Sequence, residues 1–231
     1  MNPADDLDPI VAKELIDYLQ QFATEERVKK FRETIQFRTR HITIALEDIY
    51  QSHNASAVLR TCDCFGIQNV HIIENRNKYE VNPDVALGAS KWLDLVRYNQ
   101  PGDNTVACLT RLKNDGYRIV ATTPHVNGHT PETLPLETKT ALIFGTEMAG
   151  LTPVALDMAD DFIRIPMVGF TESLNISVSA AIFIQNLTNR IRLTNIAWQL
   201  SDIEKDKILL NWLKQSINKS DMITKSFLRH S

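Results

Sequence analysis

Three short segments hold the residues of this chain that could bind a polar ligand or take part in catalysis. They span residues 53–67 (HNASAVLRTCDCFGI), 141–151 (ALIFGTEMAGL) and 165–182 (IPMVGFTESLNISVSAAI). The third segment passes from a short apolar stretch through a loop with Gly169 into small and apolar residues suited to a helix. A helix N-terminus that follows a strand and a loop exposes backbone N–H groups, which can bind polar atoms of a ligand. This pattern predicts a ligand site.

In the first segment, Asn54 and Arg60 are the side chains best suited to chemistry. Six residues place them about 240° apart around a helix, so they do not share one face. Asn54 precedes the expected helix, where an asparagine caps the first turn and can also turn toward a neighbouring site. The guanidinium of Arg60 stays protonated, which makes it a poor base but suits it to hold a phosphate or stabilise developing negative charge. A helix cap and a surface ion pair are the simpler interpretations of these two residues taken alone.

The other two segments add an acid, a hydroxyl and an amide. Glu147 lies in a loop bracketed by Gly145 and Gly150, where it could orient a donor group or simply pair with a nearby base. Ser173 and Asn175 stand just before the expected helix, and both residue types are good helix caps. Capping is compatible with a ligand contact at the same helix start.

Alternating strands and helices position these segments. Apolar runs predict strands at residues 41–48, 70–74, 93–98, 117–123, 140–145 and 161–166. Capping and periodic patterns predict helices at 54–65 (closed by Gly66), at 105–115 (capped by Asn104), after Thr152 and from Asn175 onward. Helical spacing also covers residues 9–36, and a capping box at 201–204 opens a C-terminal helix. The alternation predicts an α/β fold with a mostly parallel sheet and helices on both faces.

The common nucleotide-binding signatures are missing from the sequence. No G-x-G-x-x-G follows the first expected strand, and no G-x-x-x-x-G-K-[ST] occurs anywhere. The glycine-marked loops that could approach a ligand all lie late in the chain, at Gly145, Gly150 and Gly169. A site built from the C-terminal half is unusual for a dinucleotide-binding fold.

In this order, the three segments resemble the motifs of the TrmH/SpoU branch of the SPOUT RNA methyltransferases. The resemblance covers residues 41–197. It implies a methyltransferase domain over that range, in which a C-terminal trefoil knot cradles S-adenosylmethionine. Residues 1–40 and 198–231 are then helical N- and C-terminal extensions. It also implies a homodimer that brings the first motif of one subunit near the cofactor pocket of the other.

The resemblance also implies roles for individual residues. The matching arginine of the family is catalytic and the matching asparagine helps to hold it, so the catalytic candidates are Arg60, Asn54, Glu147, Ser173 and Asn175. The candidates for the S-adenosylmethionine pocket are Thr122, Gly145, Ile165, Met167 and Leu174. The expected reaction is methylation of a ribose 2′-hydroxyl in RNA, with tRNA and a D-loop guanosine preferred. Ribosomal RNA methylation is one alternative, and a non-catalytic RNA-binding protein of the same fold is another.

Charge is distributed unevenly along the chain, whose net charge is only −3. Residues 1–26 carry seven acids and one base, whereas residues 27–40 carry six bases and one acid. Residues 205–231 carry six bases and two acids. Separated basic patches can steer a polyanion, and the predicted RNA-binding residues are Arg27, Lys29, Lys30, Arg32, Arg38 and Arg40. The solvated face of an amphipathic helix would explain the same charges.

Composition excludes several other classes of protein. A hydrophobic content of 43% and a charged content of 23% are typical of a soluble globular protein. The acidic N-terminus has no apolar signal core, and no apolar stretch approaches the length of a membrane span, so we expect a cytoplasmic protein without a membrane partner. Of the three cysteines, Cys62 and Cys64 would lie on different faces of a helix. That spacing fits neither a zinc site nor a disulfide, and no metal is expected.

Overall fold

The computed structural model describes residues 7–79 and 88–229, which fall into two compact units. One unit spans residues 39–198, and the other combines the residues up to 38 with those from 199 onward. The sequence presents the two ends of the chain as separate extensions. In the structure they pack together, so each end supplies part of the other's core.

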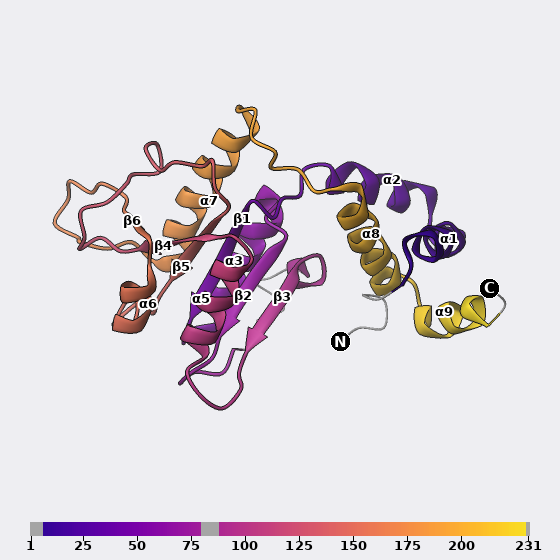
Figure 1. Cartoon of the computed structure of the whole chain (residues 1–231), viewed down its shortest axis with the longest axis horizontal. Helices are drawn as coiled ribbons and strands as arrows, with labels where there is room; N and C mark the ends of the chain where they lie inside the picture. The colour runs from indigo at the N-terminus through magenta and orange to yellow at the C-terminus, as the bar shows by residue number, and fades with distance from the viewer. Residues whose placement is uncertain (1–6, 80–87, 230–231) are drawn as a thin grey trace. The chain divides into compact units, whose positions relative to one another are not determined.

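A six-stranded sheet forms the centre of the unit at 39–198 (Figure 1). Its strands are β1 (Ile42–Glu47), β2 (Asn69–Ile73), β3 (Asp94–Tyr98), β4 (Arg118–Thr122), β5 (Thr140–Phe144) and β6 (Asp161–Ile163). They lie in the order β3-β2-β1-β5-β4-β6, and every neighbouring pair is parallel. The predicted α/β fold is confirmed, and the sheet is parallel throughout the described strands. The trefoil knot stays a prediction, because strand order alone does not define how the chain is threaded.

Helices cover both faces of this sheet. They are α3 (Ser52–Phe65), α5 (Asn104–Asn114), α6 (Pro153–Met158) and α7 (Ile176–Arg192), with a short 3₁₀ helix, η1 (Ala89–Lys91), before β3. α3 and α7 pack on each other and on the face that carries Ile44 and Leu142. α5 and α6 cover the opposite face, which carries Ala45 and Ile143. Alternate strand residues therefore enter two separate cores, as the pleat of a strand requires.

Local chemistry sets several of the helix ends. Gly66 ends α3 with a φ of 81°, a left-handed conformation that glycine adopts without steric cost. Thr152 caps α6 by accepting the N–H of Ala155, and Pro153 occupies the first helical position. Asn175 caps α7 by accepting the N–H of Ser177 at 2.8 Å. These three sequence predictions are confirmed.

The start of α5 differs from the prediction by one residue. Asp103 is the cap, because its carboxylate accepts the N–H groups of Thr105 and Val106. Asn104 instead forms the first residue of the helix and is buried, with its side chain donating to the carbonyl of Glu74. Both residue types cap helices well, and the tertiary contact of Asn104 decides between them.

The second unit consists of helices from the two ends of the chain. These are α1 (Pro9–Gln20), α2 (Glu25–Ile35), α8 (Asp202–Ser216) and α9 (Ser220–Leu228). α8 packs against both α1 and α2, and α1 also contacts α9. At the centre, Phe31 of α2 meets the ring of Trp212 edge-on, with 5.5 Å between ring centroids. The predicted capping box is confirmed, since Ser201 and Glu204 bond each other's backbone N–H groups at the start of α8.

Candidate active site

Two of the three motif segments follow the carboxyl ends of neighbouring strands, and the third follows β6 at one side of the sheet. β1 and β5 lie side by side, and the chain proceeds from them in opposite directions across the sheet. The segment after β1 leads into α3, and the loop after β5 carries Glu147. The carboxyl ends of strands at such a reversal of strand order are the usual ligand site of an open parallel sheet.

A buried amide, that of Asn54, connects all three segments. Only 3% of Asn54 is exposed. Its Nδ2 donates to Oε1 of Glu147 at 2.5 Å and to Oε1 of Gln51 at 3.1 Å. Its Oδ1 accepts a hydrogen bond from Nδ2 of Asn175 at 3.2 Å. We call Asn54, Glu147 and Asn175 the Asn54 cluster.

Asn54 is not the helix cap that the sequence suggested. α3 begins at Ser52, so Asn54 lies within its first turn, and the cap position falls on Gln51. Gln51 makes no side-chain capping bond. Hence the side chain of Asn54 is available for the other two motifs, and the asparagine is retained inside a helix despite its modest helix propensity.

The loop that carries Glu147 is a tight turn of backbone. Thr146 and Gly150 exchange two backbone hydrogen bonds of 3.0 Å. A Cβ added to Gly145 would lie 2.2 Å from the carbonyl carbon of Gly150, closer than two such atoms can approach. Glycine is therefore required at position 145 by the close passage of a second stretch of main chain.

A carboxylate missed by the sequence analysis anchors the end of this loop. Glu47, at the end of β1, is 1% exposed and accepts three hydrogen bonds. Its Oε1 accepts the hydroxyls of Thr105 (2.6 Å) and Thr152 (2.7 Å), and its Oε2 accepts the N–H of Thr152 (2.9 Å). The signal was present in the sequence, because an acid that ends an otherwise apolar strand needs partners when it is buried.

The structure leaves Arg60 and Ser173 outside the Asn54 cluster. Arg60 is exposed on α3 and forms no hydrogen bond or ion pair with the rest of the described chain. This follows from the predicted separation of Asn54 and Arg60 around the helix, since Asn54 faces inward. Ser173 is exposed on the loop before α7, and its hydroxyl likewise has no hydrogen-bond partner among residues 7–79 and 88–229.

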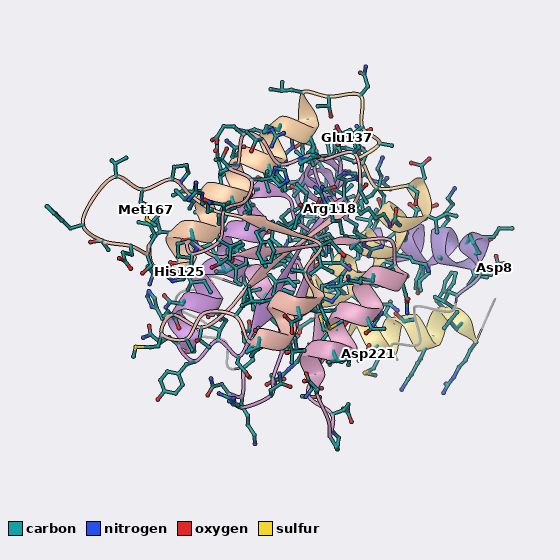
Figure 2. All side chains as sticks on the ribbon, turned by 60° about the vertical axis from the view of Figure 1, so that its left-hand side comes forward. Asp8, Arg118, His125, Glu137, Met167 and Asp221 are labelled. Atoms are coloured by element: carbon teal, nitrogen blue, oxygen red, sulfur yellow. The ribbon has the colours of Figure 1, made fainter. Side chains whose placement is uncertain are left out.

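The candidate cofactor residues lie at the carboxyl ends of β4, β5 and β6. Thr122 ends β4 and donates its hydroxyl to the carbonyl of Ile143 at 2.8 Å. Ile165 packs partly against the core, Met167 is half-buried, and Leu174 is 40% exposed. Figure 2 shows Met167 on the loop between β6 and α7. Apolar side chains and accessible backbone groups are what a planar heterocycle such as adenine needs, so these residue types fit the expected pocket.

Four of the six predicted RNA-binding residues are exposed, and the other two contact residues of the protein itself. Arg27, Lys29, Lys30 and Arg32 are exposed on α2. Arg38 is 2% exposed, and its guanidinium lies 5.1 Å from the ring centre of Trp212. Arg40 pairs with Asp94 at 2.8 Å. A buried guanidinium cannot reach an RNA phosphate, so the structure argues against Arg38 as an RNA contact.

No helix within residues 7–79 and 88–229 is long and apolar enough to cross a membrane. The same residues contain no group of three or more histidine, cysteine or acidic side chains placed to hold a metal ion.

Fold and site together define an α/β protein with a candidate ligand site at the carboxyl ends of its parallel strands. The chain belongs to the SpoU rRNA Methylase family, whose model matches residues 41–185. A tRNA (guanosine(18)-2′-O)-methyltransferase from Borreliella burgdorferi is 40% identical over 90% of this chain and 94% of its own length.

Solved structures agree with this assignment. The crystal structure of the A. aeolicus TrmH/SpoU tRNA modifying enzyme is 29% identical and superposes with a TM-score of 0.75. The match covers 84% of this chain and 98% of that one. A SpoU methyltransferase from Streptomyces viridochromogenes, solved in complex with AdoMet, shares the fold at 19% identity, with a TM-score of 0.54. That match covers 71% of this chain and 62% of the other.

Proposed function

We propose that this protein methylates a ribose 2′-hydroxyl of tRNA, with S-adenosylmethionine as methyl donor and a D-loop guanosine as target. The observation that carries the proposal is the Asn54 cluster, in which one buried amide joins all three motif segments. The 40% identical relative, named as a tRNA guanosine methyltransferase, supports the choice of RNA. The cytoplasm is the compartment in which we expect this activity.

The proposed mechanism divides the work between the cofactor and the side chains. S-adenosylmethionine would be held by Thr122, Gly145, Ile165, Met167 and Leu174, and it supplies an electrophilic methyl group when bound. The Asn54 cluster holds the loops on either side of that pocket in one arrangement. Arg60 would grip a substrate phosphate and stabilise negative charge that develops on the 2′-oxygen.

The direct test is a methyl-transfer assay with two RNA pools. Purified protein is incubated with labelled S-adenosylmethionine and either tRNA or ribosomal RNA, and mass spectrometry then maps the modified nucleotide. We expect label in tRNA, on the ribose of a D-loop guanosine. Label confined to ribosomal RNA would show that ribosomal RNA, and not tRNA, is the substrate. No label in either pool would favour a non-catalytic RNA-binding protein.

We further propose that the active unit is a homodimer. Arg60 is exposed and contacts no member of its own Asn54 cluster, so a catalytic Arg60 needs a site elsewhere. A second subunit would supply that site, with Arg60 of one chain facing the cofactor pocket of the other.

Subunit mixing tests this arrangement. An Arg60→Ala chain and a Gly145→Val chain should each be inactive alone, because one lacks the arginine and the other lacks space for the loop. Heterodimers of the two contain one site with both features intact, and activity should therefore return on mixing. Light scattering that shows a monomer at assay concentration would contradict the proposal, as would mixing that restores nothing between chains shown to associate.

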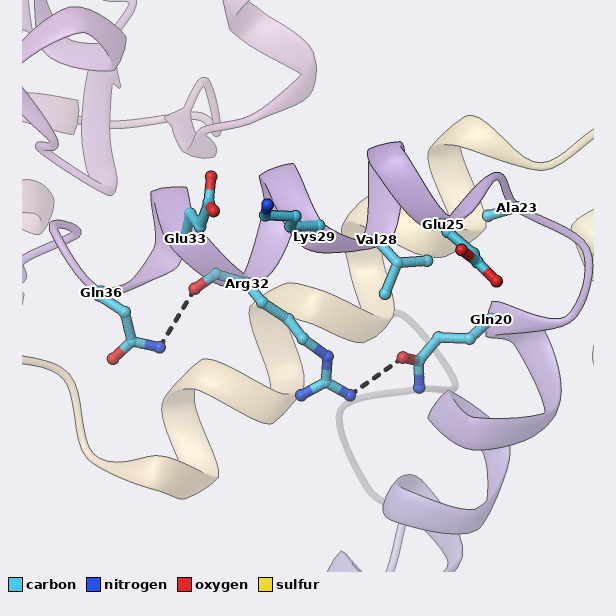
Figure 3. Close-up of a pocket in the computed structure, with 8 residues that line it drawn as sticks. All are labelled: Gln20, Ala23, Glu25, Val28, Lys29, Arg32, Glu33 and Gln36. Carbon is cyan, nitrogen blue, oxygen red and sulfur yellow. Dashed lines mark hydrogen bonds between the residues drawn. The ribbon is translucent and has the colours of Figure 1, made fainter.

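The exposed bases of α2 are proposed to contact the RNA backbone. Lys29 and Arg32 border a groove of about 580 Å³ along α2, which Figure 3 shows together with Val28 and Gln20. Nη2 of Arg32 donates to Oε1 of Gln20 at 3.0 Å, which orients the guanidinium along the groove. Contacts of this kind add affinity without reading sequence.

Charge reversal on α2 should weaken RNA binding without affecting the cofactor. The triple variant Lys29→Glu, Lys30→Glu, Arg32→Glu should raise the KM for RNA and flatten its dependence on salt. Each lost phosphate contact should reduce the magnitude of the slope of log K against log salt by about 0.7–0.9, the range for single-stranded and duplex nucleic acid. Filter binding at two salt concentrations measures both effects.

The matched control is Lys13→Glu, which reverses an exposed base on α1 outside the basic run. It should leave RNA affinity nearly unchanged, and S-adenosylmethionine binding should be normal in both proteins. Unchanged RNA affinity of the triple variant at both salt concentrations would leave these bases with a structural role only.

A further inference from the structure

A polar cavity lies at the amino ends of the strands, opposite the Asn54 cluster. It measures about 290 Å³ and is lined by Arg40, Asn69, His71, Val96, Arg111, Asp115, Tyr117 and Lys139. Several of these residues stand at or just before the first residue of a strand, whereas Arg111 and Asp115 come from the end of α5. The Asn54 cluster occupies the carboxyl ends of the strands, so this cavity is separate from the proposed methyl-transfer site. We call it the amino-edge pocket.

One wall of the amino-edge pocket is held rigidly. Nε of Arg40 donates to Oδ1 of Asn69 at 2.9 Å, and its Nη2 pairs with Asp94 at 2.8 Å. The hydroxyl of Tyr117 donates to the carbonyl of Arg40 at 2.6 Å. The guanidinium is therefore fixed before any ligand arrives, which lowers the entropic cost of binding.

The other two cations of the pocket are only loosely neutralised. Lys139 has no carboxylate partner in the part of the chain that the structure describes, and its Nζ lies 5.4 Å from the ring centre of Tyr117. Arg111 is 3.8 Å from Asp115, and both side chains are more than half exposed. Exposed pairs at that distance are weak. An anion that enters the pocket would meet two available cations and one competing acid, Asp115.

A buried, neutral histidine completes the lining of the pocket. His71 is 4% exposed, and its Nδ1 lies 3.2 Å from the hydroxyl of Tyr98. Burial, reinforced by the charge of Arg111, lowers the pKa of His71 to about 4, so the ring is neutral at physiological pH. The neutral imidazole has one N–H donor and one acceptor nitrogen, and the bond between Nδ1 and Tyr98 sets which of the two Nε2 is.

We propose that the amino-edge pocket binds a phosphate group. A tetrahedral oxyanion accepts several hydrogen bonds at once, and the fixed guanidinium of Arg40 and the exposed cations of Arg111 and Lys139 offer them from three different segments. Two sources could deliver this phosphate: the backbone of an RNA bound by the protein, or a free nucleotide or inorganic phosphate. The pocket goes beyond the proposed methyl transfer, because nothing in that reaction requires a second anion site.

Titration of the full-length protein with inorganic phosphate tests the site itself. The amide resonances of Asn69 and His71 are followed by NMR at constant ionic strength. We expect a saturable shift in the unmodified protein. The double variant Arg111→Gln, Lys139→Gln should raise the dissociation constant for phosphate about fivefold or more, the scale of two exposed charge contacts. Asp115→Asn should lower the dissociation constant, because the competing acid is removed.

The matched control is Lys91→Gln, which removes an exposed positive charge on η1, a helix that packs against α3 on the other face of the sheet. It should leave phosphate binding unchanged. The proposal is overturned by the absence of a saturable shift, by an equal loss in the Lys91 variant, or by no change with Asp115→Asn and the double variant. A general structural role for these side chains would not predict tighter binding on loss of Asp115.

A competition experiment with tRNA identifies the source of the phosphate. If RNA supplies it, inorganic phosphate should compete with tRNA, and the double variant should bind tRNA more weakly. Phosphate binding without any effect on tRNA assigns the pocket to a small phosphate ligand instead. The inorganic phosphate titration does not depend on methyl transfer, so failure of the proposed function and failure of this site give different results.

Discussion

Replacement of Arg60 by alanine is expected to lower turnover by about 10²-fold or more, the scale for removal of an electrostatic stabiliser. The binding of S-adenosylmethionine should change little, because Arg60 is exposed and is not one of the candidate cofactor residues. Steady-state kinetics with tRNA, together with calorimetry of cofactor binding, would measure the two effects separately. Stability should also be preserved, since Arg60 makes no hydrogen bond to the described chain.

The conservative variant Arg60→Lys provides the control. It retains the charge but not the planar fork of donors, and we expect it to restore little of the lost turnover. Full rescue by lysine would show that charge alone is needed at this position. Near-normal turnover of the alanine variant would remove Arg60 from the mechanism.

Replacement of Asn54 by alanine should lower both turnover and cofactor affinity. The substitution removes the donor to Glu147 and the acceptor of Asn175, both of which are exposed residues. Because both partners can then bond water, each lost hydrogen bond costs about 0.5–1.5 kcal/mol, and the two loops that carry the candidate site residues lose their common partner. We therefore expect a lower melting temperature, weaker S-adenosylmethionine binding and at least a tenfold loss of turnover, about 1.4 kcal/mol in barrier height.

Gln51→Ala is the matched control for Asn54. Gln51 is exposed and its side chain accepts a hydrogen bond from the same amide, but it forms no hydrogen bond with Glu147 or Asn175. Its loss should leave cofactor affinity close to normal. An Asn54→Ala protein that melts lower but binds the cofactor normally would limit Asn54 to a role in stability. These expected effects of Asn54→Ala differ from those of Arg60→Ala, which should lower turnover without lowering the affinity for S-adenosylmethionine.

Features set by neighbouring residues in the sequence were predicted well. The caps at Thr152, Asn175 and Ser201 and the glycine at 66 depend on interactions within one turn, and the structure has all four. Five of the six expected strands overlap their observed counterparts to within two residues at each end, because β-branched and apolar runs mark buried parallel strands.

Features set by distant contacts could not be predicted from the residues alone. Asn54 and Glu147 are 93 positions apart, and no periodicity connects them. The role of Glu47 depends equally on where Thr105 and Thr152 arrive in the fold. The break between α1 and α2 was also missed, since apolar spacing continues from residue 9 to 36 while Thr24 caps a new helix.

The shared core of the two chain ends has a consequence for how the protein is made. Leu15, Leu19 and Ile35 are almost fully buried in a unit that also requires α8. Because translation adds roughly 5–20 residues per second, α8 follows α2 from the ribosome by on the order of ten seconds or more. During that interval the apolar faces of the first two helices have no partner, although the sheet can already form. Nascent chains that stop before α8 should therefore be the forms that chaperones bind and that aggregate.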